Sequence, residues 1–211
     1  MSDPKACTRS SLADDGRRRF LYGLSLLVGG ATATQLLGHN ALATARAYTP
    51  NPESTSGSGK VFSQADMLLL RDICAQVIPR TSTAGAADVD THGFIDDQLH
   101  HCYTPQERQQ VTSLFIKINQ IAVKHHQKNF SGIVPAQQLE LLTALETTGD
   151  GFDHMDRSRF KFLKGLIVFG YYTSEVGASQ ELEYLAIPGG FTGSIPYESI
   201  GKAWGSMRTY F

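Results

Sequence analysis

Apolar residues recur at helical spacing in one segment after another between Ser63 and Tyr171, and this pattern constrains the fold most. No segment alternates apolar and polar residues for long enough to require a β-strand. The sequence therefore predicts an all-α fold, with a single small domain of about five helices and an irregular C-terminal segment rich in Gly, Pro and aromatic residues.

Two of the expected helices begin with capping signals. Ser63, with Asp66 three residues later, is a capping-box variant for a helix that Pro79 ends. Thr104 and Glu107 form a second capping box, with Pro at the first helical position. The helix after Thr104 has an apolar stripe wide enough to face a core, made of Val111, Leu114, Phe115, Ile118, Ile121 and Ala122.

Three further segments are expected to be helical: 89–103, 136–146 and 156–172. Their apolar residues recur every three or four positions, which places them on one side of each helix. We expect these core-facing residues to be Phe94, Leu99 and Cys102; Leu139, Leu142 and Leu145; and Phe160, Leu163, Ile167 and Tyr171.

The segment 1–47 has the layout of an export signal. Polar residues ending in three arginines precede a weakly apolar stretch diluted by glycine, and an A-x-A site then stands before Tyr48. The arginines resemble the R-R-x-F-L pattern of signals read by the twin-arginine translocase. The alternative is a disordered basic tail beside a short amphipathic helix. Residues 1–47 form the predicted signal peptide, which is cleaved off. The residues that define it are Arg17, Arg18, Phe20, Leu21, Ala45 and Ala47.

Residues 48–62 are rich in Pro, Ser and Gly, so we expect a disordered linker before a helical domain over 63–211. Charged residues make up 18% of the chain and its net charge is −1, which argues against nucleic acid as a partner. No run of about 18 apolar residues occurs, so no direct membrane span is expected after cleavage. Twin-arginine export would place the mature domain in the periplasm.

Motif by motif, the sequence offers no catalytic, cofactor or metal site. The G-G-F-T-G run at 189–193 lacks the preceding strand and following helix of a dinucleotide site, and no G-x-S-x-G elbow occurs. Histidines come as adjacent pairs, His100–His101 and His125–His126, and adjacent helical positions point about 100° apart. The alternative is a free-standing periplasmic enzyme or metal-binding protein that uses these histidines with Cys102 or Glu175.

The two cysteines of the mature domain, Cys74 and Cys102, would meet an oxidising compartment after export. One reading is a disulfide between them, and a second is a bridge from one of them to another chain. The third is a pair of buried thiols that behave as small apolar side chains. The sequence leaves all three readings open.

Three segments, taken in order, resemble a known family. They are LRDICAQVIPRTSTAGAADVDTHGFID at 70–96, FGYYTSEVGA at 169–178 and EYLAIPGGFTGSIPY at 183–197. Together with the export signal they are similar to the small subunit, subunit 3, of the gluconate 2-dehydrogenase group of membrane-associated, flavin-dependent sugar and sugar-acid dehydrogenases. The resemblance runs from Ser63 to Trp204.

This resemblance implies a complex in which a large FAD-dependent dehydrogenase subunit oxidises a sugar, sugar acid or polyol. It also implies a multihaem cytochrome c subunit, whose haem c passes electrons to the respiratory chain. The present chain would hold no cofactor and no catalytic residue. It would stabilise the large subunit, carry it through twin-arginine export and be held at the inner membrane through the complex.

The C-terminal segment 171–197 is expected to bind the large subunit. A small helical domain cannot easily bury so many aromatic residues, and Tyr suits interfaces because it offers a large area with a polar tip. The alternative is a lid that covers the domain's own helices. The expected interface residues are Tyr171, Tyr172, Glu175, Tyr184, Pro188, Gly189, Phe191 and Tyr197.

Overall fold

The computed structural model describes residues 48–183, 194 and 196–203. These residues form α-helices and short helical turns, and no β-strand occurs among them, which confirms the predicted all-α fold. The α-helices are α3 (Gln64–Val77), α4 (Thr91–Cys102), α5 (Pro105–His126), α6 (Pro135–Thr147) and α7 (His154–Thr173). The short turns are η1 (Phe130–Gly132), η2 (Gly177–Glu181) and η3 (Tyr197–Ser199).

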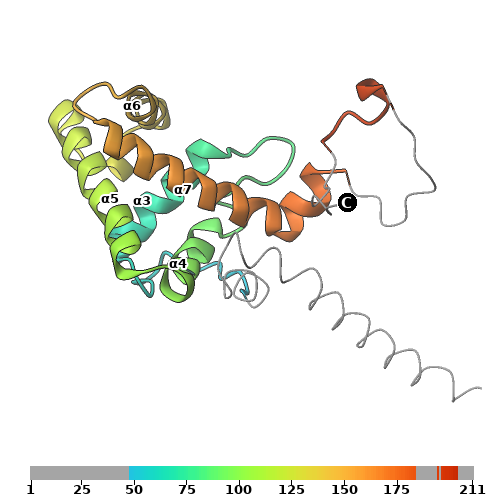
Figure 1. The fold of residues 1–211 in the computed structure, drawn as a ribbon, viewed down its shortest axis with the longest axis horizontal. Helices are drawn as coiled ribbons and strands as arrows, with labels where there is room; N and C mark the ends of the chain where they lie inside the picture. Colours follow the sequence, from blue (N-terminus) through green and yellow to red (C-terminus); the bar gives the residue numbers. More distant parts are fainter. Residues whose placement is uncertain (1–47, 184–193, 195, 204–211) are drawn as a thin grey trace, which may run out of the picture.

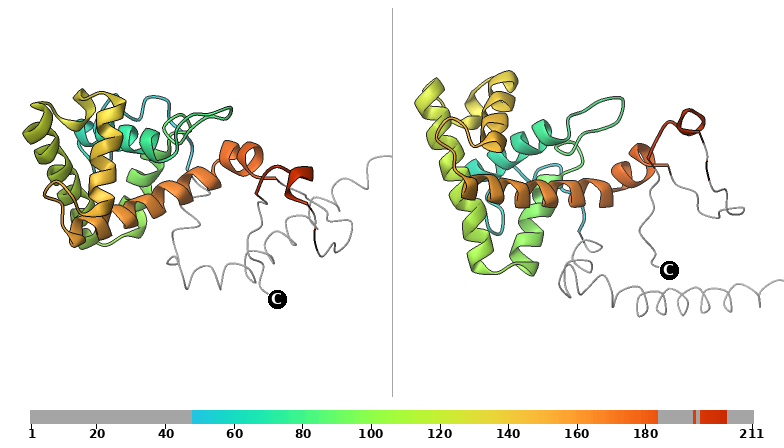
Figure 2. Two further views of the ribbon diagram at one scale, coloured as in Figure 1. Left: turned by 90° about the horizontal axis from the view of Figure 1, so that it is seen from above. Right: turned by 45° about the horizontal axis from the view of Figure 1, so that its top comes forward.

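Helix α7 lies across the other α-helices and joins them into one domain (Figure 1). It contacts α3, α4, α5 and α6, and α3 in turn contacts α4, α5 and α6. The C-terminal end of α7 runs past the other α-helices, with η2 and η3 beyond it (Figure 2). In the described part of the chain, no helix has both the length and the apolar character that a membrane crossing needs.

The core between these helices contains most of the expected apolar residues. Every residue of the expected α5 stripe is buried, and Leu70 and Ile73 of α3 pack in the same cluster. Burying one such side chain stabilises the fold by about 1.5–3 kcal/mol. The other expected residues found buried are Phe94, Leu99, Leu142, Leu145, Phe160, Leu163, Ile167 and Tyr171, while Cys102 is half-buried.

Both expected capping boxes form. The Ser63 hydroxyl accepts a hydrogen bond from the Asp66 backbone N–H, and the Thr104 hydroxyl accepts one from the Glu107 N–H, each at 3.3 Å. Helix α7 has a further capping box, in which the Asp153 carboxylate accepts from the Asp156 N–H at 2.8 Å. These local bonds satisfy donors that a helix end otherwise leaves unpaired.

The expected core position of Leu139 on α6 is wrong, because its side chain is 53% exposed. The buried face of α6 consists of Gln138, Leu141, Leu142 and Leu145. A step of three residues falls about 60° short of a full helical turn, so two such steps carry Leu139 about 120° away from Leu145. The leucine spacing alone did not distinguish the two faces.

Residues 48–62 are not the disordered linker that composition predicts; they form a loop held against α4, which we call the strap. At one end the Tyr48 ring meets the Phe94 ring edge-on, with centroids 5.6 Å apart. At the other end Phe62 is 2% exposed. Composition misses this order because the acceptors that fix the strap, Asp90 just before α4 and Asp96 within it, lie far along the sequence.

Candidate functional site

The carboxylate of Asp90, immediately before α4, holds the first half of the strap. It accepts hydrogen bonds from the Tyr48 hydroxyl, from the Asn51 backbone N–H at 2.7 Å and from the Ser54 hydroxyl at 2.6 Å. Gly93 permits this approach, because a Cβ there would lie 2.3 Å from the Tyr48 hydroxyl oxygen. A buried charge needs such donors, and here the strap supplies them.

His92 joins the same buried cluster, and its geometry tests a hydrolytic function. Its Nε2 lies 2.8 Å from Ser54 Oγ and 3.3 Å from Asp90 Oδ1. A catalytic Ser–His–Asp triad places the carboxylate on the opposite ring nitrogen, where it orients the imidazole. Here both partners share Nε2, and the buried Nδ1 has no hydrogen-bond partner among the described residues. The cluster therefore lacks triad geometry.

The burial of this cluster sets its protonation. Burial lowers the pKa of His92 from its ordinary value of 6.5, and it outweighs the opposing effect of Asp90. The imidazole is therefore neutral at pH 7. Burial also raises the pKa of Tyr48, and the hydrogen bond to Asp90 adds to this shift. The Tyr48 hydroxyl accordingly stays protonated and remains a donor.

Asp96, in the middle of α4, holds the second half of the strap. Its carboxylate accepts three backbone N–H groups: Lys60 at 2.6 Å, Val61 at 3.0 Å and Phe62 at 3.1 Å. Gly59 packs directly on this carboxyl group, where a Cβ would lie 2.6 Å from its atoms. Asp90 and Asp96 thus act as structural anchors.

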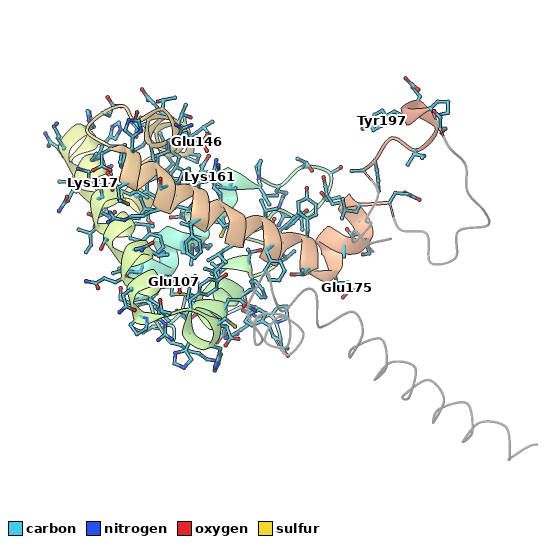
Figure 3. All side chains as sticks on the ribbon, viewed as in Figure 1. Glu107, Lys117, Glu146, Lys161, Glu175 and Tyr197 are labelled. Carbon is cyan, nitrogen blue, oxygen red and sulfur yellow. The ribbon has the colours of Figure 1, made fainter. Side chains whose placement is uncertain are left out.

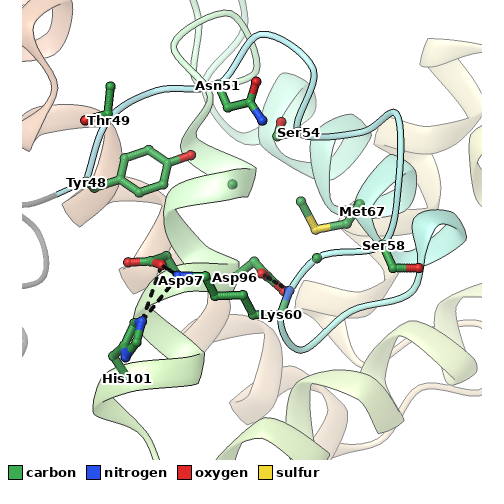
Figure 4. A pocket seen from close by; sticks show the side chains of 12 residues that line it. Tyr48, Thr49, Asn51, Ser54, Ser58, Lys60, Met67, Asp96, Asp97 and His101 are labelled. Carbon is green, nitrogen blue, oxygen red and sulfur yellow. Dashed lines mark hydrogen bonds and ion pairs between the residues drawn. The ribbon is translucent and has the colours of Figure 1, made fainter.

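A pocket of about 840 Å³ lies between the strap and α4 (Figure 4). Lys60 and Asp97 form an ion pair on its wall, and His101 Nε2 lies 3.6 Å from the same Asp97 carboxylate. Asp96, also on the wall, is occupied by the strap N–H groups. The charged groups of the pocket therefore pair with one another or with the strap.

The histidine pairs do not form a metal centre in this geometry. The rings of His100 and His101 meet edge-on at 4.6 Å, and those of His125 and His126 lie 6.3 Å apart. Within the residues that the structure describes, no three His, Cys, Asp or Glu side chains are grouped to hold a metal ion. The metal-binding alternative gains no support from these positions.

Cys74 and Cys102 are not joined by a disulfide. Cys74 is fully buried on α3, where burial raises the pKa of its thiol. Such a thiol behaves as a small apolar side chain. Cys102 is half-buried at the end of α4.

The expected interface position of Tyr171 is wrong, because this side chain is 1% exposed and belongs to the core. Its hydroxyl donates a hydrogen bond to the Ala84 carbonyl at 2.9 Å. Tyr171 shares the inner face of α7 with Ile167 at the i, i−4 spacing, whereas the next residue turns about 100° away. Tyr172 and Glu175 are exposed, as an interface requires.

The C-terminal segment closes on itself beyond the helices. The Glu183 N–H donates to the Ala203 carbonyl at 2.8 Å, and Lys202 Nζ donates to the Gln180 carbonyl at 2.7 Å. Tyr197 is 68% exposed and lies away from the helices (Figure 3). Its hydroxyl bonds to the Gly201 carbonyl within the same segment. The exposed Tyr197 ring is thus available for contact with another chain.

The other expected site residues lie outside the described part of the chain. In the predicted signal they are Arg17, Arg18, Phe20, Leu21, Ala45 and Ala47. In the C-terminal segment they are Tyr184, Pro188, Gly189 and Phe191.

Sequence reasoning missed the two anchoring aspartates. The signal available for Asp96 was its place directly after Phe94 and Ile95, both of which are buried. A carboxylate beside core-facing residues needs donors from elsewhere in the chain. Nothing in the sequence pattern shows that the strap provides them.

Comparison with known proteins gives one family. The family model described as gluconate 2-dehydrogenase subunit 3 matches residues 64–189, which is more than half of the chain. This range contains α3 to α7 and extends into the C-terminal segment. No curated protein matches, and no solved structure matches.

Proposed function

Because the chain belongs to the gluconate 2-dehydrogenase subunit 3 family, and so is a small subunit of a dehydrogenase complex, we propose that its own role is non-catalytic. In this proposal it binds and stabilises a large FAD-dependent subunit that oxidises a sugar, sugar acid or polyol. A multihaem cytochrome c subunit accepts the electrons. The observation that carries the proposal is the family match over residues 64–189, which include all five α-helices that the structure describes, α3 to α7.

The use of polar groups inside the domain supports a non-catalytic role. Asp90 and Asp96, the two buried carboxylates of the strap region, are occupied by strap donors. His92 shares one nitrogen with both of its partners and cannot act as an oriented base for Ser54. These groups stabilise the fold and leave the chemistry to the flavin subunit.

The proposal includes export of the large subunit together with this chain. Twin-arginine signals are read by a receptor on proteins that mostly fold before transport. A signal on a small subunit can therefore serve a folded partner that is bound to it. The complex would then work in the periplasm, held at the inner membrane.

Purification of the tagged full-length chain from its own cells tests this function. A large flavin-containing chain should copurify, and the complex should reduce a dye in the presence of a sugar or polyol. The small subunit, once separated, should lack flavin absorbance and turnover, and both should return when the large chain is added back. Stoichiometric flavin in the separated small subunit, or turnover by it alone, would contradict the proposal.

A further inference from the structure

The outward face of α7 changes from polar to apolar along its length. In its first half this face carries His154, Ser158 and Lys161, which are all exposed. Beyond them, the exposed residues three or four positions apart are Gly165, Val168 and Tyr172, the last two 45% and 36% exposed. We call these three residues the α7 seat. Val168 and Tyr172 thus form a small, partly exposed apolar surface on this face, which a partner helix can contact.

Gly165 is the residue of the seat that the domain's own fold does not explain. A glycine inside a helix costs about 1 kcal/mol relative to alanine. A Cβ at Gly165 would meet nothing within 4 Å, so no neighbour in the domain requires the glycine. Gly170 on the same helix differs, because a Cβ there would lie 2.6 Å from the Phe94 ring. The fold thus requires Gly170, whereas Gly165 leaves a shallow gap on the surface.

The position of the seat places it beside the segment that we propose as the partner contact. Lys161 lies on α7, and Glu175 and then Tyr197 lie beyond the C-terminal end of this helix (Figure 3). Tyr172, the last residue of the seat, lies three residues before Glu175. The seat and the exposed C-terminal residues can therefore contact one and the same chain.

We propose that a helix of the large dehydrogenase subunit packs on the α7 seat, with its backbone closest to α7 at Gly165. This inference rests on the proposed function. Packed helices lie about 8–10 Å apart, and a glycine at the crossing allows the shorter distance. The i, i+3, i+7 spacing places the three seat residues on one face of α7, which a single facing helix can contact. We choose a larger chain as the occupant because the family consists of subunits of a dehydrogenase complex, and such a subunit must contact another chain.

Two substitutions at Gly165 separate folding from binding. Gly165→Ala should raise the thermal midpoint of the separated small subunit by about 2–4 °C, because it removes the helix cost of glycine and meets open space. Gly165→Leu should fill the gap and raise the Kd for the large chain by about 30-fold, as the loss of one hot-spot contact does. Its circular dichroism should stay that of the wild type.

A second variant and a control complete the test. Tyr172→Ser should weaken the complex by a similar factor, whereas Ser158→Leu, on the polar half of the same face, should leave the Kd within about twofold. The Kd is measured by dilution of the tagged full-length complex, with bound large chain counted by flavin absorbance.

The outcomes distinguish this inference from the proposed function. If wild type binds the large chain and both Gly165→Leu and Tyr172→Ser bind it equally well, the seat is not the contact while the function stands. If wild type binds no flavin-containing chain, the proposed function itself fails. If wild type forms dimers in sedimentation and Gly165→Leu makes it monomeric, the occupant is a second copy and the inference is overturned.

Discussion

The hydroxyl of Tyr171 donates a hydrogen bond to the backbone carbonyl of Ala84, and this bond ties the end of α7 to the loop between α3 and α4. The adjacent Tyr172 points outward, with its ring 5.1 Å from that of Tyr171. Two neighbouring tyrosines therefore have separate roles, one in the core and one on the surface.

Removal of the Tyr171 hydroxyl should destabilise the domain. Tyr171→Phe leaves the Ala84 carbonyl without its partner and should lower the free energy of unfolding by about 1 kcal/mol. Tyr171→Ala should lower it by about 3–5 kcal/mol, because a cavity also forms. Urea denaturation measures both. Tyr172→Phe is the control and should change the value by less than about 0.5 kcal/mol; equal effects at the two positions would contradict the assignment.

Loss of the Asp96 carboxylate should release the second half of the strap. Asp96→Ala leaves the N–H groups of Lys60, Val61 and Phe62 without an acceptor and should lower stability by about 1–3 kcal/mol. Amide hydrogen exchange at Phe62 should become faster. Asp97→Ala, on the same helix, removes only ion pairs near the surface and should cost about 0–1 kcal/mol. Unchanged exchange in the Asp96 variant would rule out its anchoring role.

His92 should make stability depend on pH. Its pKa is lowered in the folded state by burial, among the charged groups Asp90, Arg71 and Asp72. The unfolded chain therefore binds more protons just below pH 6.5, and the free energy of unfolding should fall as pH drops from 6.5 towards the folded pKa.

Substitution by a group that does not titrate tests this dependence. His92→Gln should flatten the curve of unfolding free energy against pH below 6.5. Thermal melts at a series of pH values give the slopes. A wild-type slope in the His92 variant would show that another group titrates.

Export should depend on the arginine pair. Replacement of Arg17 and Arg18 by Lys should leave this chain, and the flavoprotein that we propose as its partner, in the cytoplasm. Cell fractionation with detection of both chains measures this. Arg19→Lys is the matched control and should export normally. Normal periplasmic levels of the double variant would contradict the twin-arginine prediction.

The helices could be predicted from sequence because their signals are local. The capping box at Thr104 and the stripe from Val111 to Ala122 specify both the start of α5 and its buried face. The leucines of α6 were ambiguous, since steps of three residues fit two faces of a helix, and only the neighbouring helices decide between them. Propensity and periodicity contain no information about those neighbours.

The candidate site was less predictable than the fold. Asp90 and Asp96 acquire their roles from strap donors that lie between 34 and 42 residues away in the sequence. Composition describes the strap as polar and flexible, whereas the two buried carboxylates, together with the packing of Tyr48 and Phe62, make it ordered. The role that we propose for Gly165 could not be predicted from sequence either, because it depends on the open space that a Cβ at this position would enter.

The strap also imposes an order on events during synthesis. Residues 48–62 leave the ribosome before α4 exists, so their N–H and hydroxyl donors wait for acceptors that are made later. Closing loops of this length costs entropy that must be offset by the packed helices. The stretch that directly follows the predicted export signal thus becomes fixed only after the first helices have assembled. An ordered strap beside the predicted export signal therefore indicates that the helical domain has already folded.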